Sequence, residues 1–159
     1  MERLWAPWRL EYITKADAEP GCVFCDALEG EDEAKLVVHR GERAFVLLNK
    51  FPYASGHFMV APLRHLGDFA TLENAEIVEI HRLAASGISA LEQLYKPEGH
   101  NLGWNLGRVA GAGVIDHIHL HVVPRWAGDT NFMPVLADVK VLPEHLSETR
   151  RRLAAAWPT

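Results

Sequence analysis

The segment DHIHLHVVPRW (residues 116–126) carries three histidines at alternate positions, together with aliphatic residues between and after them. Alternation with a period of two is the pattern of a β-strand, so His117, His119 and His121 are expected on one face of a sheet. The aliphatic residues are expected on the other face. A histidine-rich exposed strand is the plainer interpretation, but three of the nine histidines fall within five residues. We therefore predict a half-buried strand near 115–123 with an imidazole-bearing outer face.

The size and composition of the chain indicate one globular domain. It has 159 residues, of which 48% are hydrophobic and 23% charged, and we expect a single domain over 1–159. The net charge of -5 argues against binding to nucleic acid or to an anionic membrane surface. No apolar run approaches the length of a membrane span, and MERLWAPWRLEYI at the start differs from an export signal. We expect a cytoplasmic location.

The rest of the chain alternates between strand and helix patterns. After an aromatic N-terminal arm over 1–18, the chain has three strand-like runs. A helical pattern then extends from Asn74, a candidate N-cap, to Tyr95, and two more strand-like segments follow it. Pro143, at a helix N1 position, is expected to open a C-terminal helix over 143–157. The order predicts an α+β fold with a mostly antiparallel five-stranded sheet. The expected strands are 36–40, 44–49, 57–62, 101–106 and 115–123.

A glycine-rich turn, NLGRVAGAG (residues 105–113), directly precedes the histidine strand. Gly107, Gly111 and Gly113 leave main-chain N–H groups unobstructed, which suits a cradle for phosphate oxygens. Arg108 and Arg125 flank this turn and could supply charge-assisted contacts to phosphate. A flexible hairpin loop with solvated arginines is the alternative interpretation.

An imidazole that is neutral near pH 7 is a competent nucleophile toward phosphorus. His119 has a histidine on each side along the same face, and these neighbours could orient it and donate a proton to a leaving oxygen. We therefore place the nucleophile at His119, with His117 and His121 as its catalytic neighbours. The alternative is that all three are ordinary hydrogen-bonded sheet histidines.

The histidine row resembles the motif of the histidine triad (HIT) family of nucleotide hydrolases and transferases, His-φ-His-φ-His-φ-φ, in which φ is hydrophobic. The resemblance continues upstream in Leu47-Leu-Asn49-Lys and Ser55-Gly-His57, includes Asn105, and covers residues 22–125. It implies a HIT-like fold whose sheet continues across a homodimer. It also implies transfer of a nucleotidyl group through a covalent nucleotidyl-histidine.

The resemblance assigns roles to individual residues. His119 would attack the α-phosphate and His121 would contact the phosphate. Asn49 would bind ribose hydroxyls, and Asn105 would hold the region of the phosphate and the nucleophile. Two further positions, Leu47 and His57, would line the nucleoside site.

Three features of the chain resemble the bacterial diadenosine polyphosphate phosphorylase branch of the family. Many HIT hydrolases have Gln followed by Ser or Thr where this chain has Gly113 and Val114, and this chain also has Trp126 after Pro-Arg and LWAPWR at residues 4–9. The implied reaction is phosphorolysis of diadenosine tetraphosphate to ADP and ATP, in which Gly113 leaves room for inorganic phosphate. We expect Trp126 and Arg125 to approach the substrate. A hydrolase that uses water, and a non-catalytic nucleotide-binding zinc module, are the alternatives.

The motif Cys22-Val-Phe-Cys25 could supply half of a metal site. Structural zinc takes four sulfur and nitrogen ligands in a tetrahedron, and the chain offers His65 and His117 as the other two. Zinc-bearing HIT proteins and galactose-1-phosphate uridylyltransferases have a similar ligand set. The alternatives are a reduced cysteine pair beside a surface His65, or a disulfide between Cys22 and Cys25.

Overall fold

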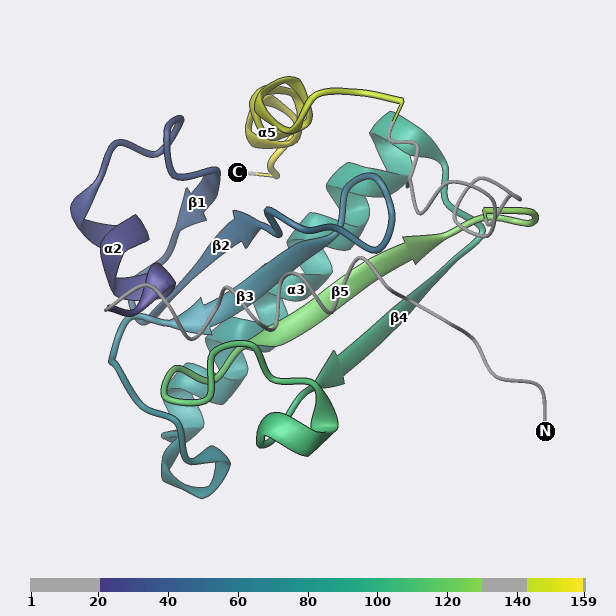
Figure 1. Ribbon diagram of the computed structural model, residues 1–159. Helices are drawn as coiled ribbons and strands as arrows, with labels where there is room; N and C mark the ends of the chain where they lie inside the picture. Colours follow the sequence, from purple (N-terminus) through teal and green to yellow (C-terminus); the bar gives the residue numbers. More distant parts are fainter. Residues whose placement is uncertain (1–20, 130–142, 159) are drawn as a thin grey trace, which may run out of the picture.

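The computed structural model describes residues 21–129 and 143–158, so the N-terminal arm lies outside the described residues. Its sheet has five strands in the order β1-β2-β3-β5-β4, and every neighbouring pair is antiparallel (Figure 1). The predicted α+β class and five-stranded sheet are therefore confirmed. The strands are β1 (Val37–Arg40), β2 (Ala44–Leu48), β3 (Phe58–Pro62), β4 (Gly99–Trp104) and β5 (Leu120–Arg125).

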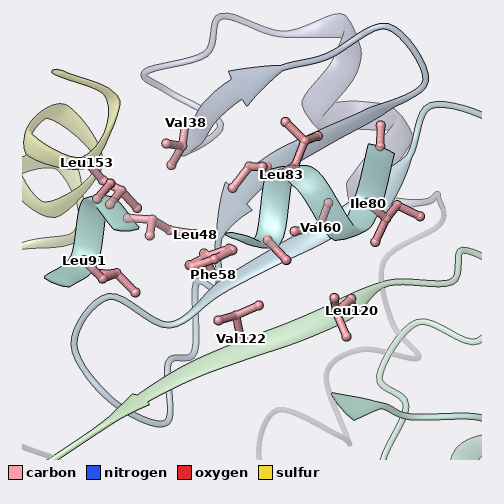
Figure 2. Packing of buried hydrophobic residues seen from close by; sticks show 14 of the residues in the cluster. Val38, Leu48, Phe58, Val60, Ile80, Leu83, Leu91, Leu120, Val122 and Leu153 are labelled. Carbon is pink, nitrogen blue, oxygen red and sulfur yellow. The ribbon is translucent and has the colours of Figure 1, made fainter. Parts of the chain in front are cut away.

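The main hydrophobic core lies between the sheet and the long helix α3 (Asn74–Tyr95). Phe58 and Val122 point from the strands toward this helix, and Figure 2 shows them beside the apolar residues of its buried face. Gly87 is required at the closest approach, because a Cβ there would lie 2.4 Å from the Phe58 ring. Leu153, from the C-terminal helix α5 (Leu146–Ala155), completes the cluster.

A short helix, α2 (Val23–Glu29), covers part of the opposite face of the sheet. Its residues Phe24 and Ala27 pack with a second cluster that includes Phe45 and Met59 from β2 and β3. Apolar layers therefore cover both faces at the sheet centre, which explains why every residue of β2 and β3 is buried.

The predicted span of α3 matches the structure, but its predicted N-cap was wrong by one residue, and the predicted start of the C-terminal helix was wrong by three. Glu73, not Asn74, is the N-cap of α3, because its carboxylate accepts from the third residue of the helix while Glu76 accepts from the Glu73 N–H. The C-terminal helix begins at Leu146 with His145 as its N-cap, so Pro143 precedes the helix instead of opening it.

The histidine strand also begins later than predicted. β5 starts at Leu120, where its pairing with both Val60 of β3 and Trp104 of β4 begins. Residues 115–119 lie outside this ladder, and β4 spans Gly99–Trp104 instead of 101–106. In the parts of the chain that the structure describes, no helix is both long and apolar enough to cross a membrane.

Candidate functional site

The three histidines of the row form a continuous set of rings, as the alternation predicts. The His119 and His121 ring centroids are 4.8 Å apart, and the Phe24 ring lies 5.0 Å from His117 and 4.6 Å from His119. The intervening Ile118 is buried in the core beneath α3. The histidine face is more deeply buried than the predicted outer face of a half-buried strand, because Phe24 of α2 packs against it: His117 is 0% exposed and His119 is 6% exposed.

A main-chain contact determines the tautomer of His119. Its Nδ1 lies 2.8 Å from the carbonyl oxygen of His117, and a carbonyl can only accept, so Nδ1 carries the proton. The unprotonated Nε2 then presents its lone pair away from that contact. Burial lowers the pKa of His119, although the bond to the carbonyl opposes this effect. A neutral imidazole with a free Nε2 is the form that can attack phosphorus.

A second chain of imidazoles reaches His121 from β3. The Tyr53 N–H donates to His57 Nδ1 over 3.1 Å, so the proton of a neutral His57 is on Nε2. This Nε2 lies 3.0 Å from His121 Nδ1 and donates to it. The proton of a neutral His121 is then on its own Nε2, which lies 3.4 Å from the Asn105 amide. The Asn105 atom at this position is Nδ2, which also donates to the Gly111 carbonyl over 3.5 Å, so this tautomer requires the amide to turn over and present its oxygen. His121 can thus present a proton donor toward the site.

The four predicted metal ligands converge on one point. Cys22 Sγ lies 3.3 Å from His117 Nδ1, and Cys25 Sγ lies 3.3 Å from His65 Nδ1 and 3.7 Å from His117 Nδ1. All four ligand atoms lie within 4.8 Å of one another. A zinc tetrahedron with bonds of about 2.0–2.3 Å has ligand separations of roughly 3.3–3.8 Å. The donor set and these distances fit such an ion.

The surroundings of these ligands also suit a cation. His117 donates its Nε2–H to the carbonyl oxygen of Pro62 over 2.8 Å, which leaves Nδ1 directed at the cysteines. Burial raises the pKa of the Cys25 thiol. The neighbouring Cys22 raises it further, because two adjacent thiolates repel each other. Burial also lowers the pKa of His117, with smaller effects from His65 and His119. Both cysteines are free thiols, so the disulfide alternative has no support in the structure.

The loop that carries His65 is fastened on two sides. Arg64 donates to both carboxylate oxygens of Glu76 over 2.7 and 2.8 Å, and this links the loop to the first turn of α3. The Ile118 N–H donates to the Leu66 carbonyl over 2.8 Å, which links it to the histidine row. No sequence pattern indicates this ion pair, because Glu76 resembles any charged residue in the first turn of a helix.

The turn at 105–113 leaves fewer main-chain N–H groups available to a phosphate than the glycine pattern predicts. The Gly111 N–H donates to Arg108 O over 2.9 Å, and the Ala112 N–H donates to Gly107 O over 3.3 Å, within a tight turn around η2 (Arg108–Ala110). Gly111 has a φ of 91°, which favours glycine. Since these N–H groups bond within the turn, the predicted cradle narrows to Gly113 and Val114. Val114 also packs against the cluster that contains Phe24.

The predicted nucleoside-binding residues lie on β2 and the turn after it. Leu47 is buried, 3% exposed, in the cluster with Phe24. Asn49 accepts from the Phe51 N–H through its side-chain oxygen over 2.9 Å, and its main-chain N–H donates to His57 O. The structure therefore brings Leu47 to the side of the histidine row that α2 covers. It places Asn49 in the turn that leads to His57.

A pocket of about 410 Å³ opens beside His121, over β4 and β5. Arg125 lines it, and its guanidinium donates to Asp129 Oδ1 over 3.0 Å and to Asn101 Oδ1 over 2.9 Å. Trp126 does not line this pocket, since its indole N–H donates to the Tyr95 carbonyl at the end of α3 over 3.1 Å. The pocket is lined by Tyr53, Asn101, Leu102, Gly103, Asn105, His121, Val123, Arg125 and Asp129.

Comparisons with known proteins agree with this geometry. Residues 29–128 match the HIT domain family. The chain is 38% identical over 165 residues to a Mycobacterium tuberculosis protein named AP-4-A phosphorylase, and the match covers 99% of this chain and 85% of that protein. A zinc-bound histidine triad protein from Mycobacterium smegmatis has a similar structure, with a TM-score of 0.67, 25% identity and coverage of 86% and 92%. A hypothetical histidine triad nucleotide-binding protein from Sulfolobus tokodaii has a TM-score of 0.67 at 26% identity, with coverage of 85% and 91%.

Proposed function

Since the chain belongs to the HIT domain family, we propose that it transfers AMP from diadenosine tetraphosphate to inorganic phosphate, with release of ATP and ADP. The observation that carries the proposal is the state of His119, whose Nδ1–H is held by the His117 carbonyl so that Nε2 is left as the nucleophile. The 38% identity to the mycobacterial AP-4-A phosphorylase, over almost the whole chain, supports the choice of substrate.

The first step is attack of His119 Nε2 on an α-phosphorus of the tetraphosphate. A nitrogen–phosphorus bond forms while the bond from that phosphorus to the bridging oxygen breaks, and ATP leaves with the electron pair. His121, whose Nε2–H is oriented through His57 and the Tyr53 N–H, donates a hydrogen bond to the phosphate oxygens as charge develops there. Burial keeps His119 neutral for this attack, because it lowers the pKa of the ring.

The second step regenerates His119. An oxygen of inorganic phosphate attacks the nucleotidyl phosphorus, the nitrogen–phosphorus bond breaks, and ADP leaves while the lone pair returns to Nε2. Gly113 and Val114 stand where hydrolases of the family have a glutamine followed by a hydroxyl residue, so the acceptor meets less side-chain bulk there. Asn105, 3.4 Å from His121, is the proposed contact for the phosphate region. Asn49 and Leu47 are the proposed contacts for the nucleoside.

We further propose that Cys22, Cys25, His65 and His117 hold a structural zinc ion. Zinc would supply a fixed tetrahedral link between α2, the loop after β3 and the start of the histidine row. The ion would help catalysis by fixing the position of His117. This residue directs its Nδ1 at the ligand cluster, and its carbonyl oxygen accepts the Nδ1–H of His119. A zinc-bound relative at 25% identity supports this assignment.

The proposed assembly is a homodimer in which the sheet continues through β4. The other edge strand, β1, is covered by the C-terminal region, because Arg150 donates to the Val37 carbonyl over 2.7 Å and Trp157 stacks on His39 at 5.0 Å. β4 pairs on one side only, and its Leu102 is 51% exposed. An open, partly apolar edge strand favours pairing with another strand. Light scattering after size exclusion tests this assembly.

Product analysis with and without phosphate tests the reaction. The purified protein is incubated with diadenosine tetraphosphate, and the nucleotides are separated at intervals. We expect one ADP for each ATP when phosphate is present, and no steady turnover without it. AMP and ATP formed without phosphate would establish the hydrolase alternative instead. No product under either condition, together with nucleotide binding, would indicate the non-catalytic module. His81→Ala, on the exposed side of α3, serves as the matched histidine control for His119→Ala.

A further inference from the structure

Resting on the proposed nucleotidyl transfer, we propose that the pocket beside His121 is the subsite for the leaving nucleotide, the ATP portion of diadenosine tetraphosphate. Its volume of about 410 Å³ falls within the roughly 300–1,000 Å³ that small-molecule sites occupy. The pocket shares only His121 and Asn105 with the residues assigned above to the reacting phosphate. Most of its lining thus has no role in the transfer step itself.

The floor of the pocket leads away from the reaction centre along two paired strands. On β5, His121, Val123 and Arg125 share one face, because alternate residues of a strand do. On β4, Gly103 pairs with His121 and Asn101 pairs with Val123. From His121 to Arg125 the strand advances roughly 13 Å, at about 3.3 Å per residue. A polyphosphate that leaves His119 past His121 would lie along this floor toward Arg125.

The far end of the pocket holds a fixed cation. Asp129 and Asn101 engage three of the five N–H donors of Arg125: the Nε–H and one Nη2–H on the Asp129 carboxylate, and one Nη1–H on Asn101. These contacts orient the guanidinium, and its side chain stays 50% exposed. The two remaining donors suit a phosphate oxygen or the polar edge of the second adenosine. The Asp129 carboxylate offsets part of the positive charge of Arg125. The fixed direction of the guanidinium N–H groups therefore contributes more to phosphate binding than net charge attraction does.

The near end of the pocket is open because position 103 has no side chain. A Cβ at Gly103 would have nothing within 4 Å, and the same is true of Gly99 in the same strand. Gly103 lines the pocket and Gly99 does not. Both glycines have φ values that other residues adopt, so valine fits the backbone at either position. Gly103→Val therefore fills the pocket entrance. Gly99 pairs with Arg125 on the same face, so the control is Ala85→Val, which adds apolar bulk at an exposed position of α3.

Two substrates that transfer the same AMP but release different groups test the subsite. Each variant is assayed with phosphate and either diadenosine tetraphosphate or adenosine 5′-phosphoramidate, whose leaving group is ammonia. For Gly103→Val we expect kcat/KM for the tetraphosphate, divided by that for the phosphoramidate, to fall about tenfold or more. Arg125→Gln removes the charge without filling the space, and we expect the same ratio to fall about fivefold. Ala85→Val should leave the ratio unchanged.

Each outcome has a distinct meaning. If the unmodified protein releases no ADP from either substrate, the proposed function fails and the subsite fails with it. If the unmodified protein is active but Gly103→Val and Arg125→Gln both keep its ratio, the subsite alone is wrong. A parallel loss with both substrates in Gly103→Val and no change of ratio in Arg125→Gln would also overturn the subsite, because the valine would then act on His121 itself.

Discussion

His117 donates and accepts at three different atoms, and one of these contacts places His119. The carbonyl oxygen of His117 accepts the Nδ1–H of His119 over 2.8 Å, while the His117 ring lies between the Pro62 carbonyl and the cysteine pair. The ligand cluster and the proposed nucleophile are therefore joined through a single residue. Any change that moves the His117 main chain should also change the direction of His119 Nε2.

The first prediction concerns metal binding. Cys25→Ser removes a thiolate ligand, so we expect the zinc bound per chain, measured by plasma emission spectroscopy, to fall well below that of the unmodified protein. We also expect the midpoint of thermal unfolding to drop, because metal that binds only the fold stabilises it. His81→Ala removes an exposed histidine and should keep the metal content. Equal zinc in Cys25→Ser and the unmodified protein would exclude this ligand set.

The second prediction concerns the acceptor. Gly113→Gln introduces the side chain that many HIT hydrolases carry at this position, and we expect it to crowd the phosphate acceptor. The rate of ADP formation should fall at least tenfold and its KM for phosphate should rise. The measurement is the initial rate of ADP formation over a series of phosphate concentrations. A variant that kept its full phosphate dependence would contradict the role given to this glycine.

The third prediction concerns the ion pair that fastens the His65 loop. The Glu76 side chain is 3% exposed and accepts two bonds from Arg64, while Arg64 is 50% exposed. Glu76→Ala removes this ion pair together with the bond from the Glu73 N–H, so it should lower the free energy of unfolding by about 1–3 kcal/mol, less than a fully buried pair would give. Urea denaturation measures this change, and Glu92→Ala, at an exposed position of the same helix, serves as the control. A change below about 0.5 kcal/mol would show that the loop is held by other contacts.

The fourth prediction concerns acid stability. Among the described residues, His100 Nε2 is a buried nitrogen without a hydrogen-bond partner, and burial lowers the pKa of this ring against a weaker opposing effect of Glu92. Between the lowered folded pKa and the unfolded value near 6.5, the unfolded chain binds a proton that the fold does not. The free energy of unfolding should therefore fall as the pH falls below about 6.5.

His100→Leu removes that proton-binding difference. Urea denaturation at pH 7 and pH 5 should show a smaller loss of stability in this variant than in the unmodified protein. His81→Leu, at an exposed position, should retain the larger loss. If His100→Leu loses as much stability in acid as the unmodified protein, the buried imidazole has no part in it.

Much of the fold could be predicted from local patterns. The period of two located the histidine strand, strand-like runs between turn residues located the other four, and the helical period located α3 from Asn74 to Tyr95. The ends of elements depend on neighbours. β5 begins at Leu120 because its partners on both sides begin pairing there, and no local signal in residues 115–119 indicates this.

The features of the candidate site that depend on the type of side chain could be predicted from the sequence. The features that depend on main-chain hydrogen bonds could not. The spacing of Cys22 and Cys25 indicated a ligand pair, and the family resemblance supplied His65 and His117. By contrast, the tautomer of His119 depends on a carbonyl oxygen, which every residue has. The tight turn around Gly111 consumed N–H groups that the glycine pattern had offered to phosphate, since a glycine pattern does not specify where those groups point.

The most direct test of the account is the mass of the protein during turnover. The purified chain is mixed with diadenosine tetraphosphate in the absence of phosphate, quenched under alkaline conditions that preserve phosphorus–nitrogen bonds, and analysed intact and after proteolysis. We predict one added AMP group per active site, located on His119, which disappears with formation of ADP when phosphate is added before the quench. Release of ATP at an undiminished rate from His119→Ala, or an adduct on a different residue, would contradict it.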